Sequence, residues 1–269
     1  KTGETSTDAA SLRALLNNSL VDADQRVFLE ALRRYRKSKK LLDTVAALVS
    51  AGKVLERIFL THHHVDHIGG VQALSEALNC PVVAHPRTAE LLAGQLEIHA
   101  FLEEGDLLET DCGPWDVLHP PGHATGHICL FNPRSGELVA GDMVAGEGTI
   151  VLDPPEGVLA DYLASLKRMR ALGPRVLYPA HGPPLTEAEA VLSWYIDHRL
   201  ERTEQVRDCL ALSSASPEEL VAQIYTEIPP AYYPVAARQV LCHLQWMESQ
   251  NEVREESGRW HRNGGQDAG

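Results

Sequence analysis

The stretch Phe59–Gly70, FLTHHHVDHIGG, places four histidines and one aspartate within six residues, directly after an apolar run. Alternate side chains of an extended segment point the same way. His62 and His64 are therefore predicted to converge on one point, while His63 and Val65 face elsewhere. Two imidazoles that converge in this way form a chelate for a metal ion.

The same stretch predicts a second metal position beside the first. Asp66 and His67 come where the chain turns into the next helix, and Gly69–Gly70 permit close packing there. Neutral imidazoles are nitrogen donors suited to zinc, so two metals sharing one loop would explain the density of ligands. The alternative is a set of surface or buried structural histidines, which the spacing after an apolar strand disfavours.

Composition limits the classes of protein. The 269 residues, 44% of them hydrophobic, can form one large core or one core with a small second domain. No apolar run reaches the ~20 residues of a membrane span. The five cysteines are scattered without a CxxC pair, so we expect a cytoplasmic protein with neither a disulfide framework nor a thiolate zinc site. The chain does not begin with methionine, and we expect further residues upstream.

Strand and helix signals alternate through the middle of the chain, which is the pattern of an α/β fold. The predicted strands are 54–60, 81–84, 115–119, 127–131, 138–140 and 175–178, and the predicted helices are 71–78 and 158–172. From Thr186 the sequence becomes mostly helical, with helices to about Leu210, at Ser216-Pro217 and after Pro234, and then a hairpin turning at Ser257-Gly258.

These signals predict a domain over residues 1–185, a small helical, winged-helix-like domain over 186–262 and a disordered tail over 263–269. In the first domain, helices are expected at 8–16 and 23–40. Residues 33–40, RRYRKSKK, form the strongest basic cluster. A solvated helix face and a phosphate-binding patch are the two interpretations of this cluster.

Three later fragments add ligand types at predicted strand ends. PPGHATGH supplies His123, VAGDMV supplies Asp142 and YPAHGPP supplies His181. Loops at strand ends gather the functional residues of α/β proteins, so these side chains are expected to meet the first loop. Thr61 is a candidate to hydrogen-bond a ligand, and His127 is a candidate support behind a ligand or a buried structural residue.

The motifs THHHVDHIGG, PGHATGH, AGDMV and PAHGP, in this order, resemble the metallo-β-lactamase superfamily. The resemblance implies an αββα sandwich with two metals. It implies that His62, His64 and His123 hold one metal, that Asp66, His67 and His181 hold the other, and that Asp142 bridges them. The stretch 146–169 and the winged-helix-like end are similar to the lactamase-beta-two group, which includes a mitochondrial endoribonuclease acting on single-stranded RNA.

One part of the chain departs from this family pattern. Family members open with a β-hairpin and a strand that ends in Asp-x-Gly, and nothing in Lys1–Gly52 matches this. Either upstream residues complete the sheet or helices take its place here. The seven expected ligands are unaffected.

Two adjacent dications lower the pKa of a shared water towards about 7, so a bridging hydroxide is the expected nucleophile. Asp66 is the expected catalytic residue, which would orient this oxygen or accept its proton. The expected metals are two zinc ions per chain, with iron or manganese as the alternatives. Such a centre can cleave a phosphodiester, a thioester or a lactam amide.

Three functions remain open on this basis. The leading one is hydrolysis of single-stranded RNA, which the group resemblance and the winged-helix-like end favour. The second is hydrolysis of small acyl substrates, as by a glyoxalase II-like thioesterase or a lactamase, which the net charge of −13 favours because it repels nucleic acid and anionic membranes. The third is a metal-binding scaffold without activity. The C-terminal domain is expected to act as a lid or a homodimer contact rather than to read DNA.

Overall fold

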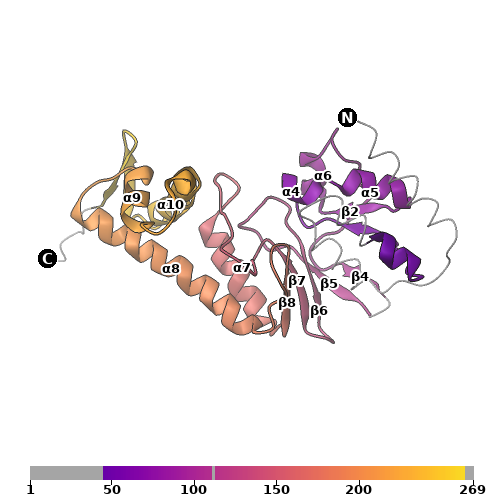
Figure 1. Ribbon diagram of the computed structural model, residues 1–269. Coiled ribbons are helices and arrows are strands. Elements are labelled where there is room, and N and C mark those ends of the chain that lie inside the picture. The colour runs from indigo at the N-terminus through magenta and orange to yellow at the C-terminus, as the bar shows by residue number, and fades with distance from the viewer. Residues whose placement is uncertain (1–44, 111–112, 264–269) are drawn as a thin grey trace. The chain divides into compact units, whose positions relative to one another are not determined.

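The computed structural model describes residues 45–110 and 113–263 (Figure 1). The helices expected at 8–16 and 23–40, the basic cluster at 33–40 and the tail after residue 263 lie outside the described residues. The chain forms two compact units, which we describe separately. The first comprises the described residues up to Pro120, Ala124–Gly148 and Gly173–Ala188. The second comprises Pro121–His123, Thr149–Leu172 and the described residues from Glu189 onward.

Two sheets build the first unit. The strands β1 (Ile58–Phe59), β2 (Val82–Ala84) and β3 (Ala100–Phe101) form a parallel sheet in that order. The second sheet has the order β4 (Leu107–Leu108), β5 (Trp115–Leu118), β6 (Cys129–Asn132), β7 (Glu137–Gly141) and β8 (Val176–Pro179). Neighbouring strands of this sheet pair antiparallel, except that β7 and β8 are parallel. The chain therefore makes a crossover connection between β7 and β8.

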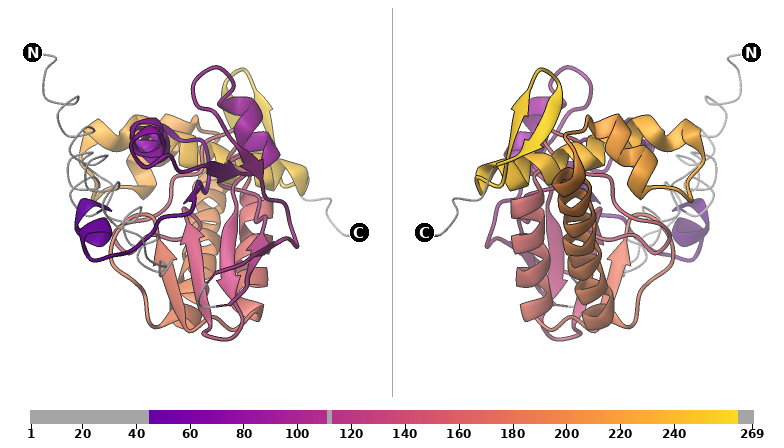
Figure 2. Two further views of the ribbon diagram at one scale, coloured as in Figure 1. Left: turned by 90° about the vertical axis from the view of Figure 1, so that its right-hand side faces the viewer. Right: turned by 90° about the vertical axis from the view of Figure 1, so that its left-hand side faces the viewer.

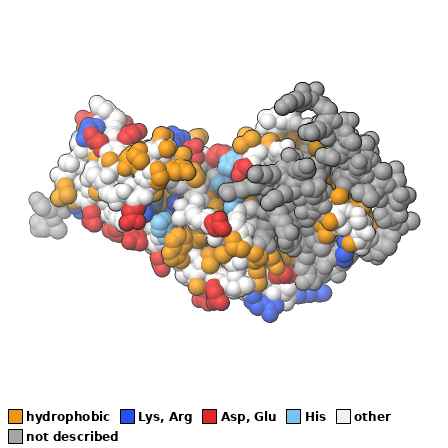
Figure 3. Space-filling model, viewed as in Figure 1, with side chains coloured by type: hydrophobic (Ala, Val, Ile, Leu, Met, Phe, Trp, Pro, Cys, Tyr) orange, Lys and Arg blue, Asp and Glu red, His pale blue; other side chains and the backbone are white. Residues whose placement is uncertain are grey.

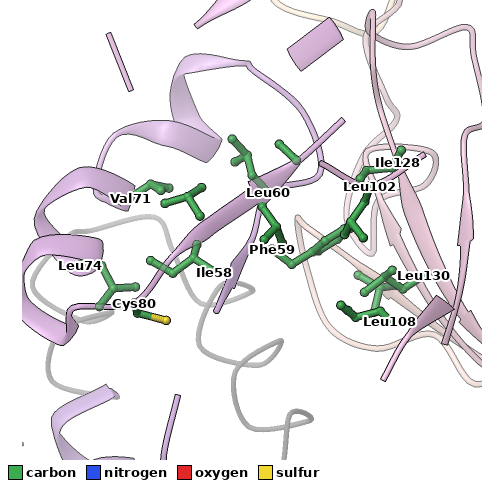
Figure 4. Packing of buried hydrophobic residues seen from close by; sticks show 14 of the residues in the cluster. Ile58, Phe59, Leu60, Val71, Leu74, Cys80, Leu102, Leu108, Ile128 and Leu130 are labelled. Carbon is green, nitrogen blue, oxygen red and sulfur yellow. The ribbon is translucent and has the colours of Figure 1, made fainter. Parts of the chain in front are cut away.

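One apolar cluster joins the two sheets, as Figure 4 shows. Phe59 of β1 lies in it with Leu108 of β4 and Leu130 of β6. On the other side of β1, Val71 and Leu74 come from helix α5 (Val71–Leu78). All five side chains are at most 3% exposed, and each contributes roughly 1.5–3 kcal/mol by burial. This cluster fixes the end of β1, from which the histidine-rich loop emerges.

Two short helices flank the strand ends of the first sheet. Helix α4 (Val65–Ile68) follows β1 directly, and α6 (Pro86–Leu91) follows β2. Helix α6 begins with His85 as its N-cap, whose ring accepts a hydrogen bond from the Arg87 amide, and with proline in its first turn.

The second unit is mainly helical. It contains α7 (Leu159–Ala171), α8 (Ala188–Leu212, in this unit from Glu189 on), α9 (Pro217–Ile224), the 3-10 turn η1 (Pro230–Tyr232), α10 (Tyr233–Ser249) and the hairpin β9 (Val253–Glu256) and β10 (Arg259–Arg262). The helices α7 and α8 run side by side, and the hairpin is the yellow ribbon of Figure 2. Ser216 and Glu219 form a capping box at α9. Ala215 forms a single antiparallel bridge with Trp260 of β10.

The architecture confirms the predicted α/β sandwich with a winged-helix-like C-terminal domain. Helix α5 has the predicted bounds. The strand predicted over 54–60 is wrong in length, because only Ile58–Phe59 pair with β2, and His127 precedes its strand rather than opening it. Among the helices that the structure describes, none is both long enough and apolar enough to span a bilayer.

Candidate metal centre

The histidine-rich loop continues from β1 with an extended backbone. The Ile128 amide donates to the Thr61 carbonyl at 2.9 Å, which ties the loop to the second sheet. The next residue, His62, is fully buried, and its Nε2 lies 3.0 Å from Nδ1 of His64. His64 keeps extended angles (φ −60°, ψ 147°) as the N-cap of α4. The two rings thus converge, as the alternation of an extended chain predicts.

His63 and Val65 lie differently. The ring centroid of His63 is 6.5 Å from that of His62, compared with 4.5 Å for His64. Val65 is 79% exposed. The rings of His62 and His63 thus point apart, whereas the His64 ring lies near both, at 4.5 Å from that of His62 and 4.9 Å from that of His63.

A second group of ligand atoms forms where α4 meets the end of β8. Nε2 of His181 lies 3.2 Å from Oδ2 of Asp66, and Nε2 of His67 lies 3.7 Å from the same oxygen. His181 follows β8, and the Ala180 amide donates to the Gly141 carbonyl at 3.0 Å, which places it beside β7. The ligand atoms of Asp66, His67 and His181 all lie within 4.8 Å of one another.

Asp142, directly after β7, lies between these groups. Its Oδ2 is 3.4 Å from Nε2 of His67, 3.4 Å from Nε2 of His181 and 4.0 Å from Nε2 of His62. Burial raises the pKa of this carboxyl, but the imidazoles of His181 and His67 outweigh burial and hold its pKa well below the usual range. One ionised oxygen thus lies among imidazoles of both groups, where a bridging ligand is expected.

Two residues support these ligands from behind. The Thr61 hydroxyl lies 3.1 Å from Nδ1 of His62. The backbone amide of Asp142 donates to Nε2 of the fully buried His127 at 3.1 Å. In a neutral ring the proton of His127 is therefore on Nδ1. This bond holds the backbone of Asp142 in place.

Gly141 makes that contact possible, and the sequence analysis did not identify it. Its φ is +52°, and a Cβ at this position would lie 2.5 Å from Nε2 of His127. A side chain would therefore push His127 away from the Asp142 amide. The glycine that precedes the aspartate in VAGDMV was the available signal.

His123 belongs to the second unit, and its contacts within that unit are as follows. Its Nδ1 lies 3.1 Å from the Val151 carbonyl oxygen. A carbonyl only accepts hydrogen bonds, so Nδ1 carries the proton, and in the neutral ring the lone pair lies on Nε2. Gly122 precedes it with φ +115°, and a Cβ there would lie 2.2 Å from the Tyr162 amide nitrogen. The assignment of His123 to the first metal stays a prediction.

The donor set of the first unit fits divalent metals. Ligand atoms at 2.0–2.1 Å from a tetrahedral zinc lie about 3.3 Å apart. The separations of 3.2 Å between Asp66 and His181 and 3.4 Å from Asp142 to His67 and His181 match this edge length. Nε2 of His67 is buried and makes no hydrogen bond of normal geometry among the described residues. A cation in this place would satisfy that nitrogen.

Comparison with sequence families gives two matches. A family described as the metallo-beta-lactamase superfamily matches residues 23–181, which is more than half of the chain. A family described as the beta-lactamase associated winged helix domain matches residues 216–260. The second match covers α9, α10 and most of the hairpin.

Individual proteins give the same picture. The chain is 30% identical over 213 residues to a beta-lactamase-like protein 2 homolog of Drosophila melanogaster, covering 74% of this chain and 70% of that protein. It is 40% identical over 126 residues to a hydroxyacylglutathione hydrolase of Bdellovibrio bacteriovorus, covering 46% of this chain and 47% of that enzyme. The crystal structure of a metallo-beta-lactamase family protein of Thermus thermophilus superposes with a TM-score of 0.63 at 25% identity, covering 77% of this chain and 80% of that one.

Proposed function

Because the chain belongs to the metallo-β-lactamase superfamily and is a hydrolase of that fold, we propose that it works with two metal ions bound at the strand-end loops. The observation that carries this proposal is the position of one Asp142 oxygen among the imidazoles of His62, His67 and His181. The proposed ligands are His62, His64 and His123 for one metal and Asp66, His67 and His181 for the other, with Asp142 shared. A scaffold without activity is thereby set aside.

The two carboxylates would have different roles because their exposure differs. The Asp142 side chain is 9% exposed, and its backbone is held by His127, so it is suited to a fixed ligand. The Asp66 side chain is 52% exposed, so it can orient a solvent molecule or accept its proton. Bound dications would supply the lowered pKa of water and the stabilisation of negative charge on the substrate.

We propose zinc as the metal, with iron and manganese as the alternatives. The proposed shell has five imidazoles and two carboxylates and no thiolate, which is a donor set that zinc, iron and manganese accept. In the second metal group, the separation of 3.2 Å between Asp66 and His181 matches a tetrahedral edge, and that of 3.7 Å between Asp66 and His67 is longer. Elemental analysis of protein expressed in medium containing all three metals distinguishes them.

For the substrate, we propose an acyl thioester. The relative that is 40% identical over 126 residues is named a hydroxyacylglutathione hydrolase. In hydroxyacylglutathione, the sulfur of glutathione carries the acyl group. The net charge of −13 also favours a substrate with few phosphates. On the face that Figure 3 shows, the Lys and Arg side chains of the described residues form small separate groups with acidic side chains between them.

Single-stranded RNA is the second candidate. The likeness to a beta-lactamase-like protein 2 homolog over most of both chains favours it, because the resemblance seen in the sequence is to a group that includes an endoribonuclease. The strand would need a local basic contact, and residues 33–40, RRYRKSKK, are the candidate.

One preparation loaded with metal tests both substrates. We expect turnover of an acyl-glutathione thioester that is nearly equal at about 50 and about 200 mM salt and is lost in Asp142→Ala. Cleavage of RNA would fall with salt, with a log-log slope of about 0.7 per phosphate contact. RNA cleavage that is lost in Asp142→Ala, without thioester turnover, would reverse the ranking. Absence of bound metal after expression with added metal would remove the proposal.

A further inference from the structure

The C-terminal helices hold one loop of the second unit by its carbonyl groups. This loop, residues 149–158, leads into α7. Three alternate carbonyls, those of residues 150, 152 and 154, accept hydrogen bonds from side chains of α10. The contacts are Gln239 Nε2 to Ile150 O at 2.9 Å, Cys242 Sγ to Leu152 O at 3.4 Å and the Arg238 guanidinium to Pro154 O.

The carbonyl between these, that of Val151, has a different partner. Because each peptide unit is planar and both flanking carbonyls are held, the peptide of residue 151 has little freedom to turn. The Val151 carbonyl accepts the Nδ1 proton of His123 at 3.1 Å. A second bond, from the Val158 amide to the Gly122 carbonyl at 3.0 Å, ties the loop to the same segment.

A buried guanidinium completes the support. Arg199 of α8 is 2% exposed, donates from Nη1 to Oε1 of Gln239 at 3.0 Å, and also donates to the Ile150 carbonyl. Its Cζ lies 5.4 Å from the ring centroid of Tyr162 on α7. Gln239 is itself 7% exposed. A buried network in which both members bind the same carbonyl gives the loop little freedom to move.

We propose that the winged-helix-like domain positions a metal ligand. The domain, through Gln239 and Arg199, holds residues 150–152, and the Val151 carbonyl then sets the tautomer and the orientation of the His123 ring. Gln239 is the positioning residue, and it acts through the backbone without touching metal or substrate. This inference rests on the proposed function, because it takes His123 as a ligand of the first metal.

The test uses a variant that removes one of the hydrogen bonds holding the loop but keeps the buried network filled. Gln239→Glu removes the amide donor to Ile150 and keeps an oxygen that accepts from Arg199. The introduced carboxylate repels the Ile150 carbonyl oxygen. An ion pair between this carboxylate and the Arg199 guanidinium offsets the loss of folding stability. Arg238→Gln is a second variant. The Arg238 side chain is 46% exposed, so its replacement leaves the buried network of Arg199 and Gln239 intact.

Thr203→Val is the matched control. Thr203 is 2% exposed on α8, donates to the Arg199 carbonyl at 3.1 Å and contacts Nδ1 of His243 at 2.8 Å. These contacts do not include the loop. The control therefore removes buried hydrogen bonds from the same domain while leaving residues 149–158 held.

Two measurements read the metals directly. Competition with a chelator gives the affinity of each of the two metals, and the visible absorption of the cobalt-substituted protein reports the ligand geometry. We expect Gln239→Glu to weaken one metal about 10- to 100-fold, with an altered cobalt spectrum, and to leave the other unchanged. Arg238→Gln should weaken the same metal by less, His123→Ala should lose that metal, and Thr203→Val should match the parent in both measurements.

Parent-like affinities and spectra in both Gln239→Glu and Arg238→Gln would overturn the positioning role while leaving the proposed function standing. Retention of both metals by His123→Ala would also overturn it. A parent protein that binds no metal would overturn the proposed function as well, so the two failures are distinguishable.

Discussion

Replacement of Gly141 by alanine should damage the proposed metal centre without changing any of the proposed ligand side chains. Gly141 has φ +52°, which costs an alanine about 1–2 kcal/mol. Its Cβ would lie 2.5 Å from Nε2 of His127 and 3.2 Å from Cβ of Thr61. His127 must move, and the buried bond from the Asp142 amide is then lost, which costs a further 1–3 kcal/mol or so. The free energy of unfolding should fall by about 2–5 kcal/mol in total.

Gly148→Ala separates the two contributions. Gly148 has φ +74°, and nothing lies within 4 Å of the position of its Cβ, so only the backbone cost applies. Urea unfolding of the metal-free proteins measures stability, and elemental analysis after dialysis measures retained metal. We expect Gly141→Ala to be the less stable of the two and to retain less metal. Equal stability and equal metal content in the two variants would refute the role of His127 in holding Asp142.

Three further predictions concern the ligands and one buried histidine. Purified protein should carry close to two transition metals per chain, and dialysis against a chelator should abolish turnover until metal is restored, with elemental analysis as the measurement. His64→Ala should lose metal and nearly all activity, whereas His63→Ala should lose far less; equal losses would contradict the alternation of the loop. His243 is 1% exposed, and burial, with Arg199 nearby, lowers its pKa to about 3. The unfolded chain therefore binds a proton below about pH 6.5 that the folded chain does not, and stability should fall by about 1.4 kcal/mol per pH unit as the pH drops from about 6.5 towards 3. His243→Gln should flatten this slope in urea unfolding between about pH 6 and 4.5, and an unchanged slope would contradict a neutral His243.

Helices were predicted well where the spacing of apolar residues along the chain determines them, and strands less well because their bounds depend on pairing partners. Helix α5 has the predicted bounds because its apolar residues recur at helical spacing. Strand β1 is shorter than predicted, because pairing with β2, and not apolar character, decides where a strand begins. The two-residue strand β3 had no local signal, since its pairing with Val83 and Ala84 arises only in the folded unit. Helix α6 had a usable signal in Pro86, which stands in its first turn.

The same division holds at the candidate site. The convergence of His62 and His64 follows from the alternation of an extended chain and could be predicted. The position of Asp142 directly after a predicted strand indicated that it would meet the histidine-rich loop. Its bridging role came only from the family resemblance, because spacing alone does not say which imidazoles surround it. The bond of His127 to the Asp142 amide and that of His123 to the Val151 carbonyl are contacts between a ring and a distant backbone group. Such contacts have no sequence pattern.

The grouping of the proposed ligands from distant strand ends has a consequence for biosynthesis. The first imidazoles leave the ribosome roughly 120 residues before His181 does, which is about 6–24 s at 5–20 residues per second. During that interval the nascent chain presents an incomplete set of donors to whatever metals the cell contains. The parallel pairing of β8 with β7, which brings His181 to Asp142, can form only after residue 181 has been synthesised. If the proposed ligand set is right, a chain stalled before residue 181 would lack one ligand of the second metal group, and the complete set would exist only in the finished fold.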